Sequence, residues 1–94
     1  MDYVELIRQA LAEVGIAMSE DEVEQVAELA RQVRVPRRQD TVKNFIAAYL
    51  RVVRGWKAKD ADRVASSPKG RRTWEEKLRT TLSQKPRSIR GGEP

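Results

Sequence analysis

The sequence contains no cysteine and no histidine. Their absence excludes disulfides, the usual Cys/His zinc sites and the two commonest nucleophile–base pairings of enzymes. Aromatic residues are also scarce, and the five present are Tyr3, Phe45, Tyr49, Trp56 and Trp74. A core must therefore consist mainly of Val, Leu, Ile and Ala, and in a chain of 94 residues it will be small.

Long apolar runs are missing as well. No run approaches the roughly 18 apolar residues that a membrane-spanning helix needs. The first ten residues, MDYVELIRQA, are acidic and amphipathic, unlike a signal peptide. The lack of cysteine is consistent with a reducing compartment. We therefore expect a cytoplasmic protein without a membrane partner.

Catalytic patterns are equally hard to find. The carboxylates cluster where helices are expected to begin, which already explains them through the helix dipole. The stretch PKGRRT at 68–73 lacks the spacing of a phosphate-binding loop. We expect no catalytic residues, no cofactor, no metal and no small-molecule substrate, and hence a non-enzymatic protein.

Apolar residues recur with helical period in three segments of the N-terminal two thirds. The first segment spans 2–15 and ends at Gly15, which suits the position just past a helix. The second follows Ser19, which with Glu22 forms a capping-box pattern, and it stops before Pro36. The third begins at Asp40 or Thr41 and carries the most apolar face of the chain. The residues expected on that face are Val42, Phe45, Ile46, Tyr49, Val53 and Trp56.

The last third of the chain has a different composition. Residues 66–72, SSPKGRR, are typical of a linker. A short fourth helix is expected after Thr73, with Trp74, Leu78 and Leu82 on one stripe. The predicted fold is thus an all-α bundle of three to four helices. We assign 1–65 to the core domain, 66–84 to a linker plus short helix and 85–94 to a disordered basic tail.

Charge is distributed unevenly along the chain. The net charge is +5, but residues 1–35 carry −5 and residues 36–94 carry +10. An acidic front and a basic back favour a polyanionic partner for the back. Alternatively, the two halves neutralise each other within one fold or one dimer.

The third helix combines its apolar face with a basic one. Opposite the apolar residues, the helical wheel places Lys43, Arg51 and Arg54 around small alanines, and 41–59 contains no acid. Such a helix suits contact with phosphates, although Lys, Arg and Ala are also the default residues of a solvated face. The nucleic-acid-binding residues that we predict are Arg37, Arg38, Lys43, Asn44, Arg51, Arg54, Lys57, Lys59, Lys69, Arg71 and Arg72. Trp56 and Trp74 lie among cations and could stack on bases, but their place on apolar stripes favours packing.

The segment RQDTVKNFIAAYLRVVRGW, at 38–56, resembles a helix of the SAM-like core-binding domain of tyrosine recombinases. Thr41, Val42, Lys43 and Phe45 match its Thr–apolar–basic–x–aromatic start. The resemblance covers about a fifth of the chain, so we do not assign the chain to that family. It implies a DNA-clamping role for this helix.

These patterns favour a small helical nucleic-acid-binding protein whose partner is DNA or RNA. A protein-interaction module is the alternative: a regulator, an adaptor or a small subunit of a larger complex. In that case the thin core and the fourth helix would be completed by a protein partner or by a homodimer.

Overall fold

A computed structural model describes the backbone of residues 2–92 and the side chains of residues 2–83. In this range the chain forms helices and no strands, which confirms the all-α bundle expected from the sequence. The helices are α1 (Tyr3–Val14), α2 (Glu20–Val33), α3 (Gln39–Val52), α4 (Ala58–Ala61) and α5 (Pro68–Gly92).

The ends of α1 and α2 follow the local signals of the sequence. Gly15 takes the left-handed conformation after α1, with φ of 73°. The Oγ of Ser19 accepts a hydrogen bond from the backbone N–H of Glu22 at 3.2 Å, as the capping pattern predicts. The capping box also predicts that the carboxylate of Glu22 accepts from the backbone N–H of Ser19. This prediction is wrong, because the carboxylate instead accepts from the hydroxyl of Tyr49 on α3. Tertiary contact has therefore replaced a local bond.

The helix α3 is shorter than the sequence suggested. Gly55 adopts a left-handed conformation, and the N–H of Trp56 donates to the carbonyl of Leu50 at 3.0 Å. The chain thus turns away after Val52. The expectation that Val53 and Trp56 belong to the inner face of this helix is wrong: Val53 is 41% exposed, and Trp56 lies outside α3.

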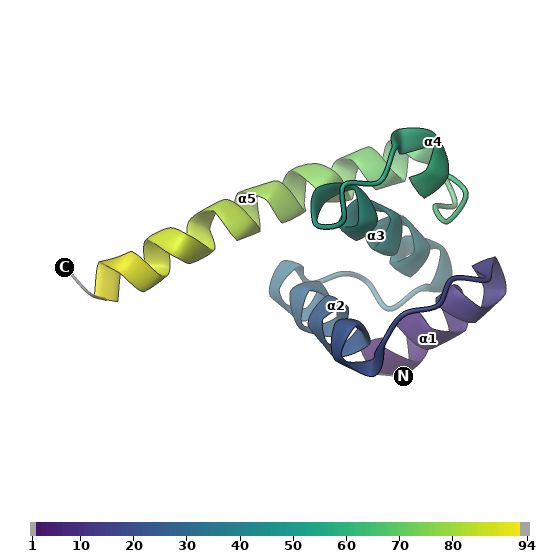
Figure 1. Ribbon diagram of the computed structural model, residues 1–94, viewed down its shortest axis with the longest axis horizontal. Coiled ribbons are helices and arrows are strands. Elements are labelled where there is room, and N and C mark those ends of the chain that lie inside the picture. The colour runs from purple at the N-terminus through teal and green to yellow at the C-terminus, as the bar shows by residue number, and fades with distance from the viewer. Residues whose placement is uncertain (1, 93–94) are drawn as a thin grey trace.

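The helix α3 lies at the centre of the molecule and contacts all four of the other helices. Figure 1 shows α1 and α2 on one side of it and α5 on the other. Seven residues of α3 are buried, six of them in one run from 45 to 50, which leaves little of the helix surface open. The ring of Phe45 meets that of Trp74 on α5 edge-on at 6.0 Å. This contact anchors α5 to the core.

The helix α5 begins earlier than expected. Residues 68–72, which we interpreted as part of a linker, form its first turns, and Ser67 caps them. The Oγ of Ser67 accepts from the N–H of Gly70 at 3.0 Å. Thr73, expected as the cap, donates its hydroxyl to the carbonyl of Lys69. The assignment to a linker is therefore wrong for 68–72, because Ser67 and Pro68 supply a complete helix start, and only 66–67 of that stretch lie outside a helix.

Two further predictions concern the C-terminal part of the chain, namely the apolar stripe of its helix and the disordered tail. Leu78 is fully buried, and Trp74 and Leu82 pack partly buried against the core, so the predicted stripe is confirmed. The backbone of α5 is helical through Gly92, across most of the segment expected as a disordered tail. The side chains from 84 onward, with residues 93–94, lie outside the described part, so the role of that tail stays a prediction.

Among the residues described, no helix combines the length and the apolar character required to cross a bilayer.

Candidate nucleic-acid interface

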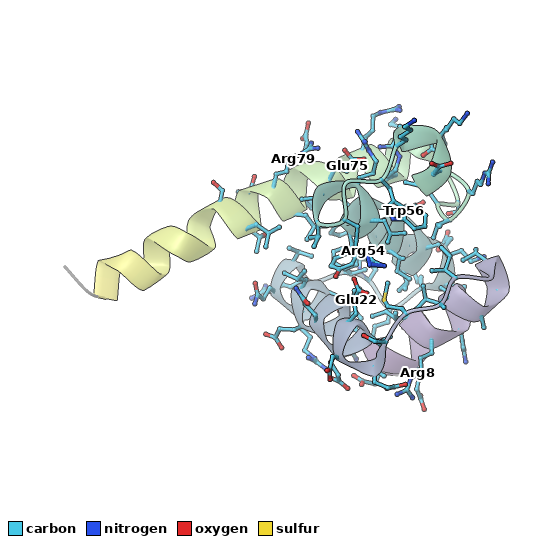
Figure 2. All side chains as sticks on the ribbon, in the orientation of Figure 1. Arg8, Glu22, Arg54, Trp56, Glu75 and Arg79 are labelled. Carbon is cyan, nitrogen blue, oxygen red and sulfur yellow. The ribbon has the colours of Figure 1, made fainter. Side chains whose placement is uncertain are left out.

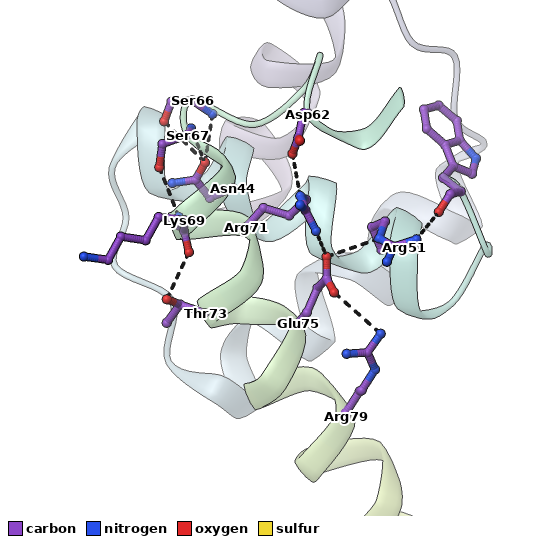
Figure 3. Close-up of polar contacts among 12 residues, drawn as sticks. Asn44, Arg51, Asp62, Ser66, Ser67, Lys69, Arg71, Thr73, Glu75 and Arg79 are labelled. Atoms are coloured by element: carbon purple, nitrogen blue, oxygen red, sulfur yellow. Dashed lines mark hydrogen bonds and ion pairs between the residues drawn. The ribbon is translucent and has the colours of Figure 1, made fainter. Parts of the chain in front are cut away.

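The basic face predicted on α3 is largely covered. Ala47 and Ala48, expected between solvent-facing cations, are fully buried. Asn44 is used structurally: its Oδ1 accepts from the backbone N–H groups of Ser66 and Ser67, at 2.8 and 3.1 Å. Figure 3 shows this amide under the start of α5. The expectation of an open cationic strip on α3 is therefore wrong, because the α4–α5 connection and α5 lie over it.

Arg51 and Arg71, both predicted to contact phosphate, belong to a partly buried ionic network instead (Figure 3). Arg71 is 4% exposed and binds the carboxylates of Asp62, at 2.5 Å, and of Glu75. Its hydrogen bonds and ion pairs with these carboxylates outweigh its burial and raise the pKa of Arg71. Arg51 donates to Glu75 at 3.3 Å and to the carbonyl of Trp56 at 2.8 Å. The network joins α3, α4 and α5, so these two arginines are structural.

Lys43 of α3 and Arg54, in the turn after α3, are paired with carboxylates of the N-terminal helices. Lys43 binds Glu13 of α1, and its hydrogen bond lowers the pKa of that carboxyl group. Arg54 lies 3.3 Å from Glu22 of α2, and Figure 2 shows the two side chains close together. Part of the acidic front thus neutralises part of the basic back within the fold, as the alternative interpretation of the charge pattern expected.

A second group of cations has no such partner. Within residues 2–83, nine Lys and Arg side chains make no ion pair with a carboxylate, and all of them follow α2. They are Arg34, Arg37, Arg38, Lys57, Lys59, Arg63, Lys69, Arg72 and Lys77. Each of them is exposed to solvent. They include six of the eleven residues that we predicted to bind nucleic acid.

Five of these cations lie within 16 residues of sequence, from the residue before α4 to the second turn of α5. We call this group the α4–α5 cationic surface; its members are Lys57, Lys59, Arg63, Lys69 and Arg72. The bond between Arg71 and Asp62 holds α4 against the start of α5, so these segments form one end of the molecule. Arg63 is not among the residues predicted from the sequence, because the neighbouring acids Asp60 and Asp62 interrupt the run of cations there.

No protein-family model, no curated protein and no solved structure matches this chain.

The loop between α2 and α3 adds two further cations. Arg37 is exposed, and its guanidinium lies over the ring of Tyr3 with 4.9 Å to the ring centre. Arg38 is exposed at the start of α3. The hydroxyl of Ser66 donates to the carbonyl of Asp40, which brings the start of α3 beside the start of α5. The loop therefore borders the end of the molecule that carries the α4–α5 cationic surface.

Among the described residues, no group of three or more His, Cys, Asp or Glu side chains gathers in one place. The network around Arg71 contains two, Asp62 and Glu75, and arginines already occupy both.

Proposed function

We propose that this chain is a small, non-enzymatic nucleic-acid-binding protein that contacts phosphates through the α4–α5 cationic surface. The observation that supports this function is the segregation of paired and unpaired cations. Those on α1, α2 and α3 meet carboxylates, whereas those of the α4–α5 cationic surface meet none among the described residues. Arg37, Arg38 and the basic C-terminal segment would extend the contact.

Unpaired cations suit this role for a physical reason. A Lys or Arg that neutralises a phosphate releases condensed counterions, and this entropy gain drives binding at low salt. A cation already paired with a carboxylate must first lose that partner, so it contributes less. From this partner we also propose a cytoplasmic location, where DNA and RNA are both accessible.

The test compares two double variants of equal charge change. Lys59→Gln with Arg72→Gln removes two cations of the α4–α5 cationic surface, and Arg8→Gln with Arg31→Gln removes two from α1 and α2. Binding to labelled DNA and RNA is measured by fluorescence anisotropy across a salt series. We expect the first variant to reduce the slope of log affinity against log salt by about two, and the second to leave it unchanged. Equal effects of both variants, or no binding at all, would refute the proposal.

A second candidate function, self-association, has one specific observation in its favour. A groove of about 350 Å³ lies where α5 leaves the bundle, with Leu29, Val52, Val53 and Leu82 along it and Gln25 and Glu28 at its side. Val53 is the exposed large apolar residue of the described chain. We propose the C-terminal segment of a second copy as the occupant. That segment carries Ile89 among Lys85, Arg87 and Arg90, a composition complementary to the groove and to the acidic α2.

Multi-angle light scattering tests this candidate directly. We expect a dimer that dissociates on the change Val53→Asp and on addition of salt, because one removes the apolar contact and the other screens the charges. The change Gln9→Asp, at an exposed position of α1, is the control and should leave the dimer intact. A monomer at all protein concentrations would eliminate the second copy as occupant.

A further inference from the structure

A pocket of about 400 Å³ lies between the end of α1, the segment before α4 and α4 itself. Its walls are mostly apolar and come from Val14, Ile16, Trp56 and Val64, with Asp60 and Arg63 as the polar groups. Figure 2 places Trp56 in this region, beside the ends of α1 and α4. The indole is partly exposed, since the turn at Gly55 carries it out of α3. Part of the Trp56 indole is thus left uncovered by the core and forms an aromatic wall of the pocket.

The pocket adjoins the α4–α5 cationic surface. Lys57 follows Trp56 directly in the chain, Lys59 precedes Asp60, and Arg63 belongs to both features. Each of these three cations is exposed and makes no ion pair within the described residues. An occupant should therefore combine a flat or apolar group with a nearby negative charge.

We infer that the Trp56 pocket receives an unpaired base of a single-stranded nucleic acid, whose flanking phosphates contact Lys57, Lys59 and Arg63. This inference rests on the proposed function and narrows its substrate class. Proteins bind single strands by stacking bases on aromatic side chains along a positively charged track, and the pocket with its flanking cations provides both elements. The carboxylate of Asp60 can accept from a base amino group, and Arg63 can donate to a base carbonyl or a phosphate.

The inference distinguishes a single-stranded ligand from a duplex. In a duplex the bases are stacked inside, so a base can enter the pocket only after costly unstacking. On electrostatics alone a duplex is the better ligand, because it carries more charge per unit length and releases more counterions. A preference for the single strand must therefore come from contacts with bases.

The experiment uses the full chain with Trp74→Phe, so that Trp56 is the one tryptophan. Trp74 packs edge-on against Phe45 in the core and takes no part in the pocket. Single-stranded DNA and RNA and a duplex of equal length are titrated while indole emission and anisotropy are recorded. We expect tighter binding of a single strand than of the duplex, together with quenching of Trp56 by the single strand.

The change Trp56→Leu, made with Trp74 intact, tests the same point by affinity. Leucine keeps an apolar wall but cannot stack, so we expect a loss of about ten-fold or more for the single strand and no change for the duplex. Circular dichroism shows whether this variant is folded; if it is not, the emission titration decides alone.

The outcomes separate the two proposals. If no nucleic acid binds, the proposed function fails and this inference fails with it. If single strand and duplex bind equally and Trp56 emission stays constant, the proposed function stands and the base pocket is overturned. Quenching by the single strand with loss of the preference in Trp56→Leu supports the inference.

Discussion

At the scale of single residues, Asn44 shows how one side chain can organise two elements. Its Oδ1 accepts from the N–H groups of Ser66 and Ser67, which would otherwise be unpaired donors before α5. The hydroxyl of Ser66 adds a longer contact at 3.4 Å. Because Asn44 is fixed by these bonds, it cannot move aside for a neighbour. It therefore requires a glycine at the facing position of α5.

The change Gly70→Ala tests this requirement. A Cβ at Gly70 would lie 2.3 Å from Nδ2 of Asn44, far inside contact distance. Helix propensity alone predicts a gain of about 1 kcal/mol for alanine in a helix. We expect the clash to win, with a net loss of about 1–3 kcal/mol in the free energy of unfolding, measured in urea.

The control for this prediction is Arg72→Ala, which lies two residues further on the exposed side of the same helix. It should change the free energy of unfolding by less than about 0.5 kcal/mol. A neutral or stabilising Gly70→Ala would show that Asn44 yields, and would contradict the account of its role.

At the scale of elements, the ionic network fixes α4 and α5 on α3. Glu75 is 5% exposed and is surrounded by guanidinium groups of Arg51, Arg71 and Arg79. A buried carboxylate tolerates such a position only when charged donors satisfy its oxygens. The described part of the chain has no buried polar side-chain atom without a partner, which is consistent with a complete network.

Adjacent arginines of α5 provide a matched test of the network. Arg71→Leu removes the donor shared by Asp62 and Glu75, and we expect a loss of about 3–5 kcal/mol in the free energy of unfolding. Arg72→Leu removes an exposed cation one position away and should have an effect below about 0.5 kcal/mol. Thermal and urea unfolding of both variants measure the difference. Similar losses for the two would show that the network contributes little.

The pair between α1 and α3 gives a pH prediction. Lys43 lowers the pKa of Glu13 below its ordinary value of 4.5, so the pair stabilises the folded state above that pH. The stabilisation is lost as the pH falls through the lowered pKa, because the protonated carboxyl no longer attracts Lys43. We expect Lys43→Met to return the pKa of Glu13 toward 4.5, as followed by carboxyl NMR titration. Arg8→Met is the control and should leave the Glu13 titration unchanged.

At the scale of the whole molecule, α3 is the helix that connects the others. It contacts every other helix, and its Phe45 and Tyr49 are among the largest fully buried side chains. Removing any one helix would expose part of α3. We therefore propose that the chain unfolds as one cooperative unit, rather than as a core domain with an attached C-terminal helix.

This description predicts coincident unfolding transitions. Far-ultraviolet circular dichroism reports all helices, whereas tryptophan emission in Trp56→Leu reports Trp74, where α5 meets α3. We expect the same urea midpoint from both probes. A lower midpoint for Trp74 emission would mean that α5 detaches first, as an independent fourth helix would.

Periodicity and capping chemistry are local, so the sequence by itself determined the helical class, the ends of α1 and α2, and the apolar stripe of Trp74, Leu78 and Leu82. It also determined that cations accumulate after Pro36. What it could not determine was which cations are free, because an ion pair depends on residues distant in the chain. Lys43 meets Glu13 and Arg51 meets Glu75, over separations of 30 and 24 residues. Only the tertiary structure decided that α3 is largely covered by the other helices, and that five of the nine unpaired cations lie around α4 and the start of α5.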